Sequence, residues 1–360
     1  MTSAADLAYC REAIKHGSKS FYAASKLLPT RVRDASLALY AFCRLADDAV
    51  DLQSEKAAAV VQLRARLDRA YRGEPLDDPV ERAFTEMVVS FDMPRALPDA
   101  LIEGLDWDAR GCRYRSLSDV RAYSARVASA VGVMMAVLMG VRDRDALARA
   151  CDLGVAMQLT NIARDIGEDA QEGRIYLPLD WFYDADLDPD DFLSKPEHRP
   201  EVADMAKRLL KESDRLYNRA EAGIAALPAD CRPGIYAARN IYAGIGKHIR
   251  GAGYDSITRR AHTGLTEKIG LMILSLGQAV TGSVMPRSAV IHADPLDETA
   301  FLIDAACAEP AADQSWGDGK LGTLVSVFAT LKERDLERRN KAQDRARSAV
   351  GSWQADPNAT

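Results

Sequence analysis

The segment YAFCRLADDAVD at residues 40–51 places polar side chains at helical spacing among apolar ones. In an α-helix, residues i, i+4, i+7 and i+11 share one face. The stripe on that face consists of Tyr40, Arg44, Asp47 and Asp51. Leu39, Phe42 and Leu45 flank the stripe, so we expect most of this helix to be buried. The segment therefore predicts a buried helix that carries two carboxylates and a guanidinium on one face.

A second stripe of the same kind lies in QLTNIARDIGEDAQEGRIYLP at residues 158–178. Its polar residues are Gln158, Asn161, Asp165 and Asp169, with Arg164 adjacent. A solvated helix face is the ordinary explanation of such charges. However, like charges one turn apart repel by a few tenths of a kcal/mol, and Asp is a poor residue for a helix interior. Apolar neighbours such as Leu159, Ile162 and Ile166 indicate burial, and buried carboxylates need partners.

Two such faces together are typical of a site for a hard cation. Mg²⁺ is usually held by a few carboxylates, by waters and by the oxygens of a bound phosphate. We therefore predict that the two stripes bind Mg²⁺, with Mn²⁺ as the alternative ion, and that they hold a diphosphate. A chain with this site is expected to be an enzyme that ionises a diphosphate substrate.

The remaining sequence predicts an all-α fold. Alanine-rich segments with apolar residues three and four positions apart recur, and alternating β-branched runs are absent. Ser118 is expected to cap one helix, which Gly140 would end. The next helix is expected to start at Asp143, to run to about Glu172 and to stop at Gly173.

The composition changes after Pro286. An apolar stripe from Leu321 to Leu331 is followed by an almost wholly charged segment. We therefore predict a main all-α domain over residues 1–285, followed by accessory helices and a disordered tail over residues 286–360.

Charge and apolar content exclude several classes of protein. A net charge of -6 argues against a nucleic-acid binder, which needs a basic surface. Six dispersed cysteines without zinc spacing predict reduced, mostly buried thiols. The N-terminus lacks a secretory signal, so we expect a cytoplasmic protein. The uncharged segments 127–141 and 269–286 are too short or too polar for convincing membrane spans, and we expect a core helix in each.

Five blocks in order resemble those of bacterial phytoene synthases, within the squalene and phytoene synthase family. They are GSKSFYAASKLLP (17–29), YAFCRLADDAVD (40–51), YSARVASAVG (123–132), LGVAMQLTNIARDIGEDAQEGRIYLP (153–178) and RNIYAGIGKHIRGAGYD (239–255). The resemblance covers about residues 15 to 285. It implies a single large helical bundle of the class I isoprenoid synthase type with a central prenyl cavity.

The resemblance also implies roles for particular residues. The implied metal ligands are Asp47, Asp51, Asn161, Asp165 and Asp169. The implied diphosphate or metal-cluster contacts are Arg44, Gln158, Arg164 and Arg259. The implied flap and cavity residues are Ser18, Lys19, Ser20, Tyr40, Tyr123, Tyr242 and Tyr254. Gly17 stands where some relatives have His, which argues against a direct role for His16, and Ser129 stands where many relatives have Gly.

The resemblance implies a head-to-head condensation of two geranylgeranyl diphosphates. The product would be phytoene, formed through prephytoene diphosphate with release of diphosphate and without NADPH, in carotenoid biosynthesis. Met134, Met135 and Met139 are candidate tunnel residues because thioethers fill irregular apolar space, with plain core packing as the alternative. Expected partners are the two prenyl diphosphates and, reversibly, a membrane surface, which makes the protein peripheral to the membrane. We expect the membrane contact at apolar residues near Phe21 and Tyr22 or at the helix over residues 269–285. Carotenoid-pathway enzymes are candidate protein partners.

Three alternatives remain open at this point. A squalene or presqualene diphosphate synthase would use farnesyl diphosphate, and a class I terpene cyclase would carry similar acidic motifs. A noncatalytic family member that acts as an assembly protein should have lost acidic ligands, whereas both stripes are intact here.

Overall fold

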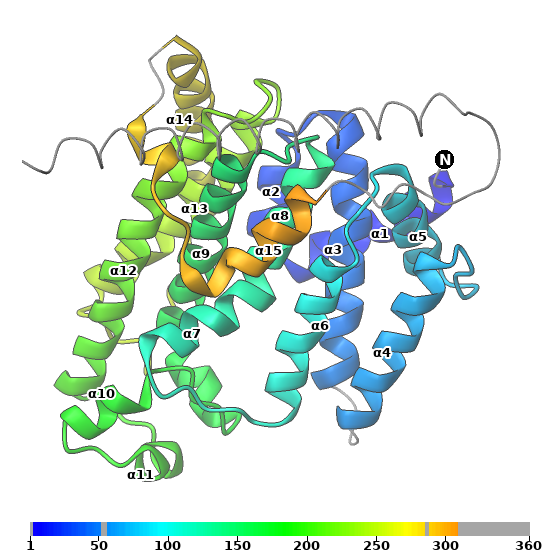
Figure 1. Cartoon of the computed structure of the whole chain (residues 1–360). Helices are drawn as coiled ribbons and strands as arrows, with labels where there is room; N and C mark the ends of the chain where they lie inside the picture. Colours follow the sequence, from blue (N-terminus) through cyan, green and yellow to red (C-terminus); the bar gives the residue numbers. More distant parts are fainter. Residues whose placement is uncertain (1–2, 52–55, 285–287, 309–360) are drawn as a thin grey trace, which may run out of the picture. The chain divides into compact units, whose positions relative to one another are not determined.

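The computed structural model of the chain describes residues 3–51, 56–284 and 288–308. These residues belong to one compact unit and form helices, without a strand among them (Figure 1). The predicted all-α class is therefore confirmed. In chain order the elements are α1 (Ala4–Gly17), α2 (Lys19–Ser25), α3 (Thr30–Asp51), α4 (Lys56–Tyr71), α5 (Pro79–Ser90), α6 (Ala96–Ala109), α7 (Leu117–Ser124), η1 (Ala125–Ser129), α8 (Ala130–Leu138), α9 (Arg144–Gln171), α10 (Leu179–Asp184), α11 (Pro189–Ser194), α12 (Pro200–Ile224), α13 (Arg232–Gly251), α14 (Leu265–Val284), η2 (Ala289–His292), η3 (Asp297–Thr299) and α15 (Ala300–Cys307).

The long helix α9 begins and ends where the sequence predicts. The Asp143 carboxylate accepts a hydrogen bond of 3.0 Å from the backbone N–H of Ala146, which satisfies one of the free donors at the helix start. Gly173 follows the last turn with φ of +74°, a left-handed conformation that glycine adopts without steric cost. Because α9 packs against α8, α12 and α13, its side chains reach several parts of the interior (Figure 1).

The segment before Gly140 differs in part from the prediction. Ser116, and not Ser118, caps α7 in a reciprocal capping box with Asp119, while the Ser118 hydroxyl donates to Glu298. The π-helical turn η1 then separates α7 from α8, so the expected single helix is interrupted. Gly140 follows α8 with φ of +75°, as expected of a terminating glycine.

Buried apolar side chains form two large clusters that meet along α9. The first joins α1, α3, α4, α5, α6 and α8 with the N-terminal half of α9. The second joins the C-terminal half of α9 with α10, α12 and α13. The cysteines are unpaired, as expected, but only Cys10, Cys151 and Cys231 are buried, and Cys112 is exposed.

The two uncharged segments, 127–141 and 269–286, lie in different environments. Residues of η1 and α8 pack in the interior, so a core helix is confirmed there. By contrast, the main packing partners of α14 among the described elements are α13 and α2. One apolar face of α14 stays exposed. The expectation of a core helix at 269–286 is therefore wrong, because apolar composition does not tell how many sides of a helix are covered. No helix in the described ranges is long and apolar enough to cross a membrane.

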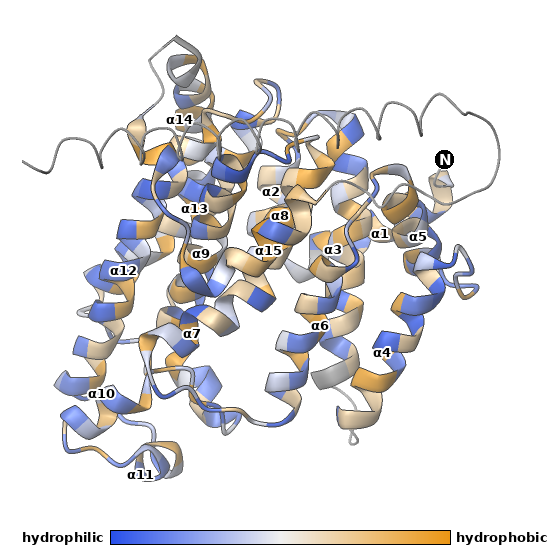
Figure 2. Ribbon diagram, viewed as in Figure 1, coloured by the Kyte–Doolittle hydropathy of each residue, from blue (hydrophilic) through white to orange (hydrophobic). Residues whose placement is uncertain are grey.

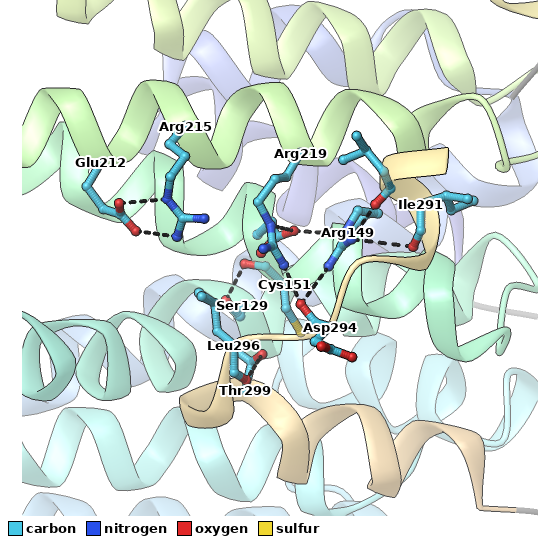
Figure 3. A network of polar contacts seen from close by, with 12 residues as sticks. Ser129, Arg149, Cys151, Glu212, Arg215, Arg219, Ile291, Asp294, Leu296 and Thr299 are labelled. Carbon is cyan, nitrogen blue, oxygen red and sulfur yellow. Dashed lines mark hydrogen bonds and ion pairs between the residues drawn. The ribbon is translucent and has the colours of Figure 1, made fainter. Parts of the chain in front are cut away.

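A buried ion network ties the segment that contains η2 to α9 and α12 (Figure 3). Arg149 lies 2.7 Å from the carboxylate of Asp152, and both side chains are fully buried. Arg219 of α12 donates to the same carboxylate at 3.0 Å, and Arg149 donates to the carbonyl of Val290 at 2.7 Å. Charges so deeply buried are tolerated only when they are paired and hydrogen-bonded. Residues 309–360 lie outside the described residues, so the division at 285, the apolar stripe from 321 and the disordered tail stay predictions.

Candidate active site

The helix α3 carries the first acidic motif. Arg44 is paired with two carboxylates of its own helix, at 3.1 Å from Asp47 and 2.6 Å from Asp48. These side chains are about half exposed, at 40% to 47%, so they reach solvent and are not part of the core. Asp51 ends α3, but its side chain lies outside the described residues.

The helix α9 carries the second acidic motif at its C-terminal half. The Arg164 guanidinium donates to the neighbouring Asp165 carboxylate at 2.8 Å from Nε. Arg260, in the segment that follows α13, donates to the same carboxylate at 3.0 Å and pairs with Glu168 at 3.2 Å. Two guanidinium groups thus converge on Asp165. Arg259, which we expected to be a phosphate contact, is exposed beside Arg260, which is itself 54% exposed, and its expected role stays a prediction.

Asp169 lies one turn beyond Asp165 in an environment that disfavours its charge. Burial and the nearby Asp165 carboxylate together raise the pKa of Asp169 to about 8. Asn161 donates from Nδ2 to Gln158 at 3.3 Å, but its buried Oδ1 has no hydrogen-bond partner within the described residues. A buried amide oxygen and a carboxylate with an unfavourable negative charge both fit a divalent cation.

The acidic side chains do not form a complete metal site by themselves. No group of three or more His, Cys, Asp or Glu side chains in the described ranges is arranged to hold a metal ion. The observations that fit a divalent cation at the second acidic motif are the unpartnered Oδ1 of Asn161 and the raised pKa of Asp169.

An apolar cavity of about 320 Å³ begins next to the second acidic motif. Its lining residues on α9 run from Ala146 to Asn161, which is about 22 Å along a helix axis. The lining is mostly apolar, and its polar members include Ser18, Gln158 and Asn161. An elongated apolar space with polar groups only at particular points suits a long hydrocarbon chain with a charged head.

Several predicted residues do line this cavity. They are Ser18, Tyr40, Gln158, Asn161, Tyr242, Met135 and Met139. Ser18 also caps α2 by accepting a hydrogen bond of 3.2 Å from the backbone N–H of Phe21. Tyr40 stacks on Phe21, with ring centroids 5.6 Å apart, and burial raises the pKa of Tyr40 to about 12, so the phenol stays neutral. Phe21, which we expected only as a membrane-contact residue, also lines the cavity, although we did not predict it as a site residue.

Other predicted residues lie elsewhere. Tyr123 does not line the cavity, because its hydroxyl donates to Asp108 of α6 at 2.8 Å and its ring stacks on Tyr176. Tyr254, with φ of +61°, packs against the second core cluster. Met134 is buried outside the cavity lining, as core packing requires. Of the remaining flap residues, Ser20 is partly buried on α2 and is not among the described residues that line the cavity, while the side chain of Lys19 lies outside the described residues.

The family match covers most of the chain. Residues 14–267 match the family described as squalene/phytoene synthase. The chain belongs to the squalene/phytoene synthase family. The predicted membership is therefore confirmed, and the acidic motifs on α3 and α9 lie within the matched range.

Sequence relatives in this family are similar over nearly their whole length. The chain is 52% identical over 338 residues to a phytoene synthase of Rhodobacter capsulatus, which covers 93% of this chain and 98% of the relative. It is 54% identical over 348 residues to a phytoene synthase of Cereibacter sphaeroides, which covers 94% of this chain and 96% of the relative.

Solved structures of family members share the fold. A dehydrosqualene synthase in complex with a ligand has a TM-score of 0.71 at 31% identity, covering 77% of this chain and 97% of that one. A squalene synthase from Alicyclobacillus acidocaldarius has a TM-score of 0.64 at 24% identity, covering 69% of this chain and 95% of that one, and at this identity the likeness concerns the fold alone. The predicted all-helical isoprenoid synthase fold is confirmed by these neighbours.

Proposed function

We propose that the chain is a Mg²⁺-dependent prenyltransferase that condenses two geranylgeranyl diphosphates head to head to phytoene, in carotenoid biosynthesis. The observation that carries the proposal is the apolar cavity that runs along α9 from the second acidic motif. Identity above 50% to phytoene synthases over more than nine-tenths of the chain supports this product.

The reaction begins when the C–O bond of one allylic diphosphate breaks. Mg²⁺, when bound by Asp47, Asp51, Asn161, Asp165 and Asp169, supplies positive charge that stabilises the leaving diphosphate. Arg44 and Arg164 lie beside these ligands and add fixed positive charge where the negative charge develops. Release of the anion leaves an allylic cation whose hydrocarbon chain lies in the cavity.

The double bond of the second substrate then attacks this cation. Loss of a proton closes the ring of prephytoene diphosphate, the second diphosphate leaves, and a rearrangement with a further proton loss yields phytoene. The rings of Tyr40 and Tyr242 line the cavity and can stabilise passing cations by roughly 0.5–2 kcal/mol each. The apolar lining also excludes water, which would otherwise trap the cations. No step consumes a hydride, so no NADPH is required.

The alternative is a product built from farnesyl diphosphate, because the dehydrosqualene synthase structure is 31% identical to this chain. Incubation with geranylgeranyl diphosphate and Mg²⁺ without reductant, followed by identification of the hydrocarbon, tests substrate, ion and reaction together. A parallel incubation with farnesyl diphosphate serves as the comparison. Phytoene from the first reaction is expected, whereas turnover of the shorter substrate alone or a strict need for NADPH would favour the alternative.

We further propose that the protein works in the cytoplasm and touches the membrane reversibly. Prenyl tails and a forty-carbon hydrocarbon partition into lipid, so contact with a bilayer would spare the product a passage through water. Other carotenoid-pathway enzymes are candidate partners at the same surface.

A further inference from the structure

The outer face of α14 is apolar along its whole length. Its exposed apolar residues are Leu265, Ile269, Ile273, Leu274, Leu276 and Val280, each between 46% and 77% exposed. Apart from Leu274, they follow one another at a spacing of four, four, three and four residues, which places them in one stripe. Scattered exposed apolar residues are common, but a contiguous stripe of this kind marks an interaction surface.

Three polar residues of α14, Glu267, Ser275 and Gln278, turn toward α13, whereas Thr266 and Thr281 are exposed. Asn240 of α13 donates to Ser275 at 2.9 Å and to Gln278 at 2.6 Å, and Ser275 is fully buried. His248 of α13 lies 2.7 Å from the carboxylate of Glu267. These contacts set the rotation of α14, and the rotation they select turns the apolar stripe outward.

The outer face also lacks charge. Between Ile269 and Val284 the sequence contains no Asp, Glu, Lys or Arg. Apolar residues recur along α14 in Figure 2, where most other outer helices show alternating colours. A face with no charged residue beyond Lys268, and with large apolar side chains outnumbering the exposed hydroxyls of Thr266 and Thr281, suits an occupant that is itself apolar.

The inner face of α14 covers the wall of the prenyl cavity. Met272 packs against a small cluster that contains Ala24 of α2 and Ala238 of α13. Both alanines also line the cavity. One layer of small side chains thus separates the inner face of α14 from the space assigned to the prenyl chain. The apolar stripe lies on the opposite, exposed face of the same helix.

We propose that the outer face of α14 docks on the hydrocarbon boundary of a phospholipid bilayer. Docking there leaves only α14 between the lipid, which holds the prenyl substrates and receives the hydrocarbon product, and the α2 and α13 wall of the cavity. This role of the cavity rests on the proposed function, whereas the docking itself rests on the exposed stripe. The stripe lacks charge, so the binding is hydrophobic and does not depend on anionic lipids.

The test is co-sedimentation with vesicles of phosphatidylcholine, using the full chain and a variant with Ile269→Ser, Ile273→Ser and Val280→Ser. All three positions are exposed, so the fold is retained. The matched control carries Val61→Ser and Val89→Ser, at positions of similar exposure (67% and 63%) on α4 and α5. We expect the triple variant to lose at least about tenfold in vesicle partitioning, the control to change by less than about twofold, and about 0.5 M salt to leave binding of the unmodified chain intact. Equal binding of all three proteins, or binding abolished by salt, would overturn the proposal.

The occupant is identified by a photo-crosslinking benzophenone side chain introduced in place of Ile273. Cross-links to lipid are expected. Cross-links to a peptide of residues 309–360, or to a second copy of the chain, would instead assign the face to the protein itself and overturn the bilayer proposal. Diphosphate release in detergent separates this proposal from the proposed function: the triple variant should match the unmodified chain there. Absence of turnover in both proteins would count against the function, while the vesicle result still decides the docking.

Discussion

Arg260 donates a hydrogen bond of 3.0 Å to the carboxylate of Asp165, although 95 positions separate the two residues in the sequence. The same guanidinium lies 3.2 Å from Glu168. The segment after α13 is thereby tied to the second acidic motif at the point where the diphosphate is expected to bind. Sequence comparison with the family selected Arg259, and only the fold distinguishes the two adjacent arginines.

Replacement of Arg260 should impair catalysis more than replacement of Arg259. Arg260→Gln removes a charge-assisted contact to the acidic motif, so we expect kcat/KM to fall by at least about tenfold. Arg259→Gln removes the same charge from the adjacent exposed position, and we expect less than about a threefold change. Steady-state diphosphate release measures both. Equal losses would mean that only the net charge of the segment matters.

Loss of one proposed metal carboxylate should abolish most turnover. Asp47→Asn and Asp165→Asn each remove a negative oxygen ligand without changing volume, and we expect a loss on the order of a thousandfold in kcat. Asp48→Asn is the control within the same turn of α3, since Asp48 pairs with Arg44 but is not a proposed ligand. We expect its effect to stay below about tenfold. Thermal unfolding should show that a variant without turnover is still folded. Near-normal turnover of either ligand variant at saturating Mg²⁺ would refute the assignment.

The raised pKa of Asp169 predicts a stability effect that depends on pH. Burial and Asp165 raise the pKa of Asp169 to about 8, far above the ordinary range of an aspartate, so the folded state binds this proton more tightly than the unfolded state does. The resulting stabilisation is present at low pH and is lost as pH rises to about 8. Above that pH the metal-free protein carries the full cost of the charged group.

Asp169→Asn removes this cost, so its benefit should grow with pH. In the presence of a chelator, we expect the variant to melt about 2–5 °C above the unmodified protein at pH near 9, with a difference that shrinks toward pH 4. Added Mg²⁺ should raise the Tm of the unmodified protein more than that of the variant. Thermal unfolding across this range provides the measurement, and a constant difference at every pH would show that Asp169 does not titrate as described.

The contact between α9 and η1 should not tolerate a methyl group. A Cβ on Gly154 would lie 2.5 Å from Cα of Ser129, whose hydroxyl donates to the carbonyl of Cys151. Because the obstructing atoms belong to the backbone, we expect Gly154→Ala to destabilise the fold by about 1–3 kcal/mol. Gly270→Ala in α14 is the control, since nothing lies within 4 Å of a Cβ there and alanine favours a helix by about 0.5–1 kcal/mol. Denaturant unfolding of both variants should give changes of opposite sign.

Local sequence determined much of this protein. Helical periodicity predicted the all-α class and placed both acidic motifs on single helix faces, because these properties depend only on neighbours within a few turns. The ends of α9 at Asp143 and Gly173 were predictable for the same reason, since capping is a contact between residues close in sequence. The family blocks predicted the cavity residues that lie next to the motifs, such as Tyr40 and Tyr242.

Contacts between distant segments were decided by the tertiary structure alone. Tyr123 turns to Asp108 instead of the cavity, and Arg260 reaches Asp165, because the packing of each segment selects which side chain meets a distant partner. The apolar segment of α14 could equally have been a core helix by its composition. It became a surface helix because Asn240 holds Ser275 and Gln278 toward α13. No described element covers the opposite face. Sequence patterns describe the faces of a helix, but only the fold decides what each face meets.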